Sequence, residues 1–198
     1  MVGTGAAVGE FIERLSAVAD TAGRRDREGI LERLRFDRSD AQAIDASDSW
    51  FYGELVRRES FDVDSQELRQ YFDAPRVLQG LLDVTGRLLG LEYTAVPEGA
   101  SWHKDVHVYD VAVAGCRIGR IHLDLHPREG KFKRAAMFEI MAGVEGEQLA
   151  EGALACNLPT GLMEHSHVVT LFHEIGHLVH HILAKGQKYA TFAGTATE

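Results

Sequence analysis

The sequence predicts an α+β fold that is predominantly helical and contains a small antiparallel sheet. Over about residues 1–90, apolar side chains recur every three to four positions, as on one face of a helix. Over about residues 91–160 they alternate instead, as in half-buried strands. The helical period returns over about residues 165–185, and the last part of the chain, about residues 161–198, holds six of the ten histidines. We predict that residues 1–198 form a single domain.

The first part is expected to contain four helices. Their predicted spans are about 6–36 with a charged break at 24–28, about 45–61, a short helix from Ser65, and about 75–89. Phe11, Leu15 and Val18 lie on one face of the first helix. Pro75 suits the first turn of the fourth helix and Gly90 suits its end, because proline has no N–H to satisfy and glycine accepts a positive φ.

The sheet and the last helix follow. The predicted strands are residues 106–113, 118–126 and 135–141, separated by the turn residues Ala114-Gly115 and Pro127 to Gly130. Residues 146–157 give no clear pattern. The last helix is predicted over about residues 165–185 and closed by Gly186. It is apolar nearly all round, which is typical of a buried helix.

Composition excludes several classes of partner. The net charge is −9, and no basic stripe is present, so neither nucleic acid nor an anionic membrane surface is expected to bind. The sequence contains no run of 18 apolar residues, which excludes a transmembrane helix. Cys116 and Cys156 are too few for a disulfide framework, which predicts a reducing, cytoplasmic location.

The residues with the clearest chemical implication are His173-Glu174-Ile175-Gly176-His177, an HExxH motif. Residues i and i+4 of a helix lie one turn apart on the same face, so both imidazoles can reach one metal ion. Zinc accepts imidazole nitrogen and, in catalytic sites, takes three protein ligands plus water. Glu174 is placed beside a ligand, where a general base is needed. We therefore predict one Zn²⁺ bound by His173 and His177, with Glu174 as the catalytic base.

The third zinc ligand is less clear from spacing. In zincins with a glutamate ligand, that residue lies about 20 or more positions beyond the second histidine, and Glu198 lies at such a distance. His180 and His181 follow the motif on the same helix. They are expected to pack or to support the ligands, because they lie seven and eight residues after His173.

Two other histidine pairs leave a second metal site open. His103 and His107 are four residues apart, as are His122 and His126, and residues i and i+4 of a strand share a face. With Asp124 beside the second pair, a cupin-type oxygenase site is an alternative. We favour the interpretation that these histidines lie on the sheet surface and in loops.

Four blocks of the sequence resemble one peptidase family. They are Trp102-His-Lys-Asp-Val106, Leu125-His-Pro-Arg-Glu-Gly-Lys131, Thr170-Leu-Phe-His-Glu-Ile-Gly-His-Leu-Val-His180 and Phe192-Ala-Gly-Thr195. In this order they resemble the thimet oligopeptidase family, which includes oligopeptidase A and dipeptidyl carboxypeptidase. The resemblance covers essentially the whole chain.

This resemblance implies a zincin-like fragment of a zinc metallopeptidase that hydrolyses short peptides. Residues 161–198 would then hold the active-site helix and a Gly-Thr loop. In the family the third ligand is the glutamate of Asp-Phe-Val-Glu, which by count would lie about four positions past Glu198. The 198-residue chain alone is therefore expected to be inactive. The alternative is a non-catalytic truncated homologue with weak metal binding, and the oligomeric state stays open.

Overall fold

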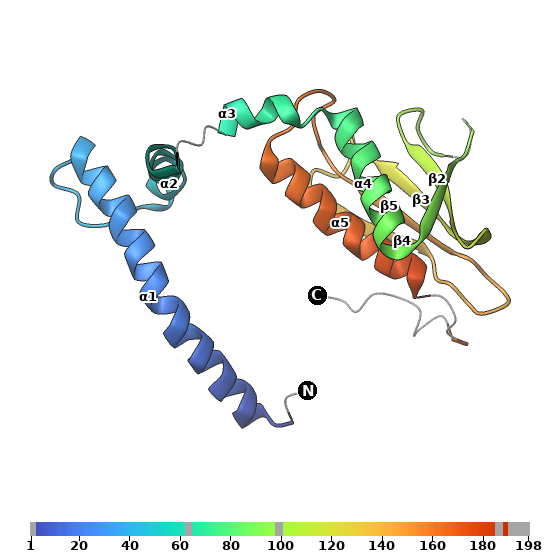
Figure 1. Cartoon of the computed structure of the whole chain (residues 1–198), viewed down its shortest axis with the longest axis horizontal. Helices are drawn as coiled ribbons and strands as arrows, with labels where there is room; N and C mark the ends of the chain where they lie inside the picture. The colour runs from blue at the N-terminus through green and yellow to red at the C-terminus, as the bar shows by residue number, and fades with distance from the viewer. Residues whose placement is uncertain (1–2, 62–64, 98–100, 185–187, 190–198) are drawn as a thin grey trace. The chain divides into compact units, whose positions relative to one another are not determined.

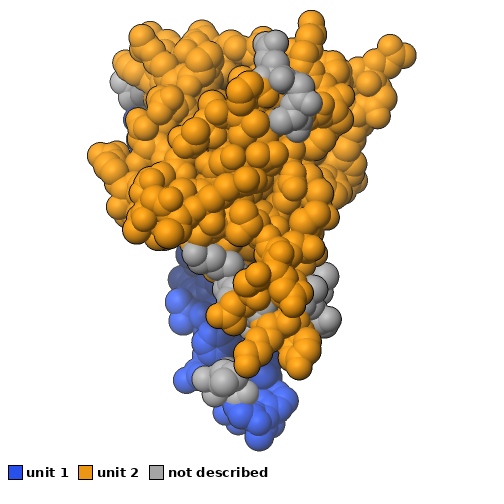
Figure 2. All heavy atoms as spheres, turned by 90° about the vertical axis from the view of Figure 1, so that its right-hand side faces the viewer, with its two compact units in different colours: residues 1–64 blue, residues 65–198 orange. Residues whose placement is uncertain are grey.

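The computed structural model describes residues 3–61, 65–97, 101–184 and 188–189. The chain divides into two compact units, Met1–Asp64 and Ser65–Glu198 (Figure 2), and each is described by itself. The single-domain prediction stays a prediction. No helix among the described residues is long and apolar enough to span a membrane.

The described residues of the first unit form two helices, α1 (Gly5–Asp37) and α2 (Ala46–Phe61). The hydroxyl of Thr4 caps α1 by accepting a hydrogen bond from the Ala7 N–H at 3.2 Å. The predicted break at residues 24–28 is wrong, because α1 continues through it. Its charged residues are exposed helix formers, and Arg24 forms an i,i+4 ion pair with Asp20 at 2.7 Å.

The second unit contains a five-stranded sheet and the helices that pack on it. Its elements are α3 (Ser65–Leu68), the short 3₁₀ helix η1 (Arg69–Tyr71), α4 (Ala74–Leu89), β1 (Leu91–Ala95), β2 (His107–Val113), β3 (Cys116–Asp124), β4 (Ala136–Met141), β5 (Ala150–Ala155) and α5 (His165–Leu183). Gly90 ends α4 with a φ of 68°, as its sequence position predicts. The α+β class is confirmed.

The prediction of a purely antiparallel sheet is wrong. The strand order is β1-β2-β3-β5-β4, and β3 pairs with β5 in parallel, with Gly119 opposite Ala150. The chain leaves β3, forms β4 at the edge of the sheet, and returns antiparallel as β5 between the two. An alternating pattern identifies a half-buried strand but not its partner. It also missed β1 and β5.

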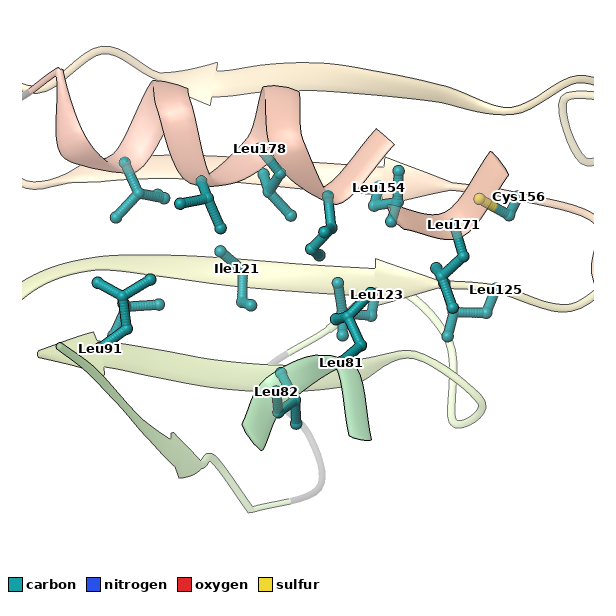
Figure 3. Close-up of a cluster of buried hydrophobic side chains, with 14 of the residues drawn as sticks. Leu81, Leu82, Leu91, Ile121, Leu123, Leu125, Leu154, Cys156, Leu171 and Leu178 are labelled. Atoms are coloured by element: carbon teal, nitrogen blue, oxygen red, sulfur yellow. The ribbon is translucent and has the colours of Figure 1, made fainter. Parts of the chain in front are cut away.

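Helices α4 and α5 cover the same face of this sheet (Figure 1). Leu81 of α4 and Leu171 and Leu178 of α5 point into one apolar cluster with Leu123 of β3 and Leu154 of β5 (Figure 3). All five side chains are buried. This cluster holds α5 in place on β3 and β5.

Helix α5 is buried on one face only, so the prediction of a helix buried all round is wrong. Its buried side chains are Leu171, Ile175, Leu178, Val179, His181 and Ile182. Val169 and Phe172 are exposed although they are apolar, with 53% and 39% of their surface accessible. Periodicity could not show this, because apolar residues occupy both faces. The exposed face is the one that carries His173.

Candidate functional site

His173 and His177 lie one turn apart on the outer face of α5. The two rings are 4.8 Å apart and nearly perpendicular, and their Nε2 atoms are separated by 3.1 Å. If one metal ion lay at the usual zinc–imidazole distance of about 2.0–2.1 Å from each nitrogen, the N–metal–N angle would be about 100°, near the tetrahedral value. The two side chains therefore fit a shared metal ion.

Glu174 is half-buried, and the residues about one turn before and after it on α5, Leu171 and Leu178, are buried. Burial raises the pKa of the Cys156 thiol to about 12, and the negative charge of Glu174 contributes to this rise. No cation of the described residues forms an ion pair with Glu174.

The described residues contain no group of three or more His, Cys, Asp or Glu side chains arranged to hold a metal ion. Within them, His173 and His177 are the two imidazoles of the motif that come together. Glu198, the Gly-Thr block at Phe192–Thr195 and Gly186 lie outside the described residues. The predictions for these positions stay predictions.

Two glycines let α5 approach the sheet closely. A Cβ on Gly119 of β3 would lie 2.7 Å from Ala150 O and 3.0 Å from two Ile182 carbons. A Cβ on Gly152 of β5 would lie 2.6 Å from Leu178 Cδ1 and 3.2 Å from His181 Cδ2. The absence of side chains at these two positions therefore sets how deeply the last turns of α5 sit.

The histidines of the alternative metal site are placed differently from the prediction. His126 lies beyond the end of β3 and His103 lies before the start of β2, so neither pair shares a strand. His122 is buried, not on the surface, and its Nε2 lies 2.6 Å from Glu151 Oε1. His126 Nδ1 lies 3.0 Å from Leu158 O. His122 and His126 thus already have protein partners.

Asp124 is the centre of a buried ionic network that the sequence did not reveal. Its carboxylate accepts two hydrogen bonds from Arg128, at 2.5 and 2.6 Å, and one from Trp102 Nε1 at 3.0 Å. The ammonium of Lys131 lies 2.8 Å away. Burial raises the pKa of Asp124, but these three donors and the Lys131 charge lower it further than burial raises it, so the net pKa is well below the usual range.

Lys131 extends this network to the main chain. Its Nζ donates to the carbonyl oxygens of Asp124, His126 and Cys156, at the carboxyl ends of the parallel strands β3 and β5. Two of the four blocks that carry the resemblance, at 102–106 and 125–131, therefore meet at one carboxylate. The signal in the sequence was an acidic residue followed by Arg and Lys within one turn segment.

Comparison with known proteins places the chain in a family. The profile of Peptidase family M3 matches residues 1–198. The chain is 35% identical over 164 residues to a thimet-like oligopeptidase of Dictyostelium discoideum, covering 76% of this chain and 24% of the relative. It is 32% identical over 149 residues to an oligopeptidase A of Haemophilus influenzae, covering 70% and 22%.

A mitochondrial intermediate peptidase of Arabidopsis thaliana is 33% identical over 165 residues, covering 75% of this chain and 23% of the relative. The chain thus spans about a quarter of the length of these curated relatives. The resemblance stated from the four blocks is confirmed by these matches. The chain belongs to peptidase family M3.

Proposed function

We propose that the chain forms the metal-binding part of a zinc-dependent oligopeptidase that hydrolyses short peptides in the cytoplasm. The observation that carries the proposal is the His173–His177 pair, whose Nε2 atoms are 3.1 Å apart on the outer face of α5. Membership of a family whose curated relatives are named as peptidases supports the same reaction class.

The two imidazoles would hold Zn²⁺ through their Nε2 atoms. When bound, zinc lowers the pKa of a coordinated water to about 7 and polarises the scissile carbonyl. Glu174 would accept the proton that the attacking water loses and deliver it to the departing amine. Glu174 suits this role because it directly follows His173 on the helix, so its carboxylate can lie beside the metal without displacing a ligand.

A catalytic zinc site normally has three protein ligands, and the described residues supply two that converge. We propose that the third is the glutamate expected about four positions past Glu198, in a longer protein that includes this chain. The chain by itself would then bind zinc weakly and hydrolyse no peptide.

The test compares the 198-residue chain with a version extended through the proposed ligand. Zinc affinity is measured by calorimetry, and hydrolysis is measured with a quenched fluorescent peptide. We expect the extension to tighten zinc binding by orders of magnitude and to restore hydrolysis. Equal zinc affinity in both proteins would contradict this proposal and make Glu198 the candidate for the third zinc ligand.

The Glu174→Gln variant of the extended protein tests the catalytic base. Glutamine keeps the size of the side chain but cannot accept the proton, so the rate should fall by about 10²–10⁴-fold or more. Zinc stoichiometry should stay at one. Retention of more than about a tenth of the rate would contradict the assigned role, and loss of zinc would make Glu174 a ligand or a structural residue.

A further inference from the structure

His181 is a buried histidine on the metal helix that the proposed reaction does not use. It lies one turn after His177, and none of its surface is accessible. Its Nε2 atom is 3.1 Å from the carbonyl oxygen of Met141 in β4 and 3.1 Å from that of Glu151 in β5. Both oxygens only accept hydrogen bonds, so Nε2 carries a proton and shares it between them.

The two carbonyls lie at an irregularity of the sheet. Met141 and Glu151 are opposite each other, and the register of β4 on β5 shifts between Glu139 and Met141. A bulge of this kind locally disrupts the hydrogen bonds of the ladder. A donor from α5 therefore reaches main-chain oxygens at a place where the β4–β5 pairing is irregular.

Two neighbours flank the ring. Gly152 provides the space, since a Cβ there would lie 3.2 Å from His181 Cδ2. On the other side of the ring, Glu139 Oε2 lies 3.4 Å from Nδ1. The imidazole thus occupies the space left by the missing side chain of Gly152 in β5. Its Nε2 contacts Met141 and its Nδ1 contacts Glu139, both in β4.

We propose that His181 is a positioning residue: its Nε2–H, shared between Met141 O and Glu151 O, fixes the depth and rotation of α5 on the sheet. It thereby sets where the His173–His177 pair lies relative to β4, the edge strand of the described sheet. Apolar packing alone holds the helix less specifically, because leucine side chains tolerate small shifts, whereas a hydrogen bond is directional. The proposal rests on the proposed function only for the importance of that position.

Two substitutions separate the hydrogen bond from the shape of the side chain. His181→Phe keeps a ring of similar size but removes the donor and leaves two carbonyls without it. His181→Gln keeps an N–H donor on a flexible side chain. His180→Phe is the matched control, because His180 is the preceding residue but is exposed.

The position of the pair can be measured without catalysis. Cu²⁺ serves as the probe because imidazole binds it more tightly than zinc. A nitroxide is attached to the exposed Cys116 at the start of β3, while the buried Cys156 stays unlabelled. Double electron–electron resonance then reports the distance from Cu²⁺ on α5 to a fixed point of the sheet. Loss of Cu²⁺ from the His173→Ala variant confirms where the probe sits.

We expect His181→Phe to shift or broaden the distance distribution, His181→Gln to restore it at least in part, and His180→Phe to leave it unchanged. A wild-type distribution in a folded His181→Phe protein would overturn the proposal. Long-range ¹H–¹⁵N spectra of the wild-type chain give a second test, because the His181 proton must be found on Nε2. A neutral ring protonated on Nδ1 would overturn the proposal as well.

The two proposals fail differently. If the chain bound no Cu²⁺ at His173 and His177, the metal pair would be wrong, and the ¹⁵N spectrum would still decide His181. If Cu²⁺ bound but the Cu²⁺–nitroxide distance did not change in the His181 variants, only the positioning role would be wrong. Should His181→Phe fail to fold, His181→Gln and the spectrum remain as measurements.

Discussion

Substitution of Gly119 by alanine tests the close approach of α5 to the sheet. The new Cβ would lie 2.7 Å from Ala150 O, a main-chain atom of the neighbouring strand, and 3.0 Å from two atoms of Ile182. The side chain of Ile182 can adjust, but the carbonyl cannot move without disturbing the parallel pairing of β3 and β5. The strain must therefore be taken up by the backbone or by displacement of the helix.

The magnitude follows from two opposing terms. Overpacking of a core costs about 1–3 kcal/mol, and the upper end applies because the nearest atom belongs to the main chain. Alanine recovers about 0.5–1 kcal/mol, since glycine loses more chain entropy on folding. The net loss should be about 2 kcal/mol. With a urea m-value of roughly 2 kcal/mol per molar, the unfolding midpoint falls by about 1 M.

Urea unfolding followed by circular dichroism measures this midpoint, and two other glycines calibrate it. Gly152→Ala should cost less, about 1 kcal/mol, because its nearest neighbour is the end of the Leu178 side chain. A Cβ added to Gly80 of α4 would have no atom within 4 Å beyond its own helix backbone and chain neighbours, so Gly80→Ala should stabilise by about 0.5–1 kcal/mol. If Gly119→Ala were as stable as Gly80→Ala, the inferred depth of α5 would be wrong.

Three further results are expected. His173→Ala should abolish Cu²⁺ binding, whereas His122→Ala should not; the measurement is a titration followed by Cu²⁺ absorbance. The reverse result would favour the alternative metal site on the strands. Asp124→Asn should destabilise by about 3–5 kcal/mol at pH 7. Folding lowers the pKa of Asp124, so the stabilisation by its carboxylate is present above the unfolded pKa of 3.8 and is lost as pH falls below that value. The urea midpoints of the wild type and the variant should therefore converge toward acid pH. A constant difference between the two midpoints would contradict the ionic network. Near neutral pH in the folded protein, Cys116 should react with a thiol reagent, whereas Cys156, with its raised pKa, should not. The reagent should therefore titrate one thiol before unfolding and two after it. Two fast-reacting thiols in the folded protein would contradict the burial of Cys156.

Local patterns predicted the elements whose signals are local. The helix α4 begins near Pro75 and is capped by Gly90, as the special backbone preferences of these residues require. The α5 helix contains the HExxH residues, and the i,i+4 spacing alone brings His173 and His177 together. No distant contact is needed for that pair, because the helix repeat places both rings on one face.

Pairing and burial could not be predicted in this way. The alternation that predicted β3 is the same for a parallel or an antiparallel neighbour, and the parallel β3–β5 contact depends on β4 lying at the edge. Likewise, the composition of α5 indicated a fully buried helix. Its outer face is exposed because the sheet offers only one side for packing.

Buried charge was the hardest feature to anticipate. The sequence makes Asp124 a candidate metal ligand beside His122 and His126, but in the structure its carboxylate accepts hydrogen bonds from Arg128 and Trp102. Its partners are defined by how the segments before β2 and after β3 fold back onto the sheet. A sequence shows which side chains carry charge, whereas the partners of a buried charge depend on the surrounding chain.

By itself, the sequence determined the helix that carries the proposed metal pair, the identity and spacing of its two imidazoles, and the family to which the chain belongs. These are properties of one continuous segment or of the order of short motifs. The tertiary structure alone decided how that helix is seated, since Gly119, Gly152 and the shared proton of His181 act between elements far apart in the chain. The physical reason is that spacing along a helix fixes which side chains share a face, but only packing fixes what that face meets.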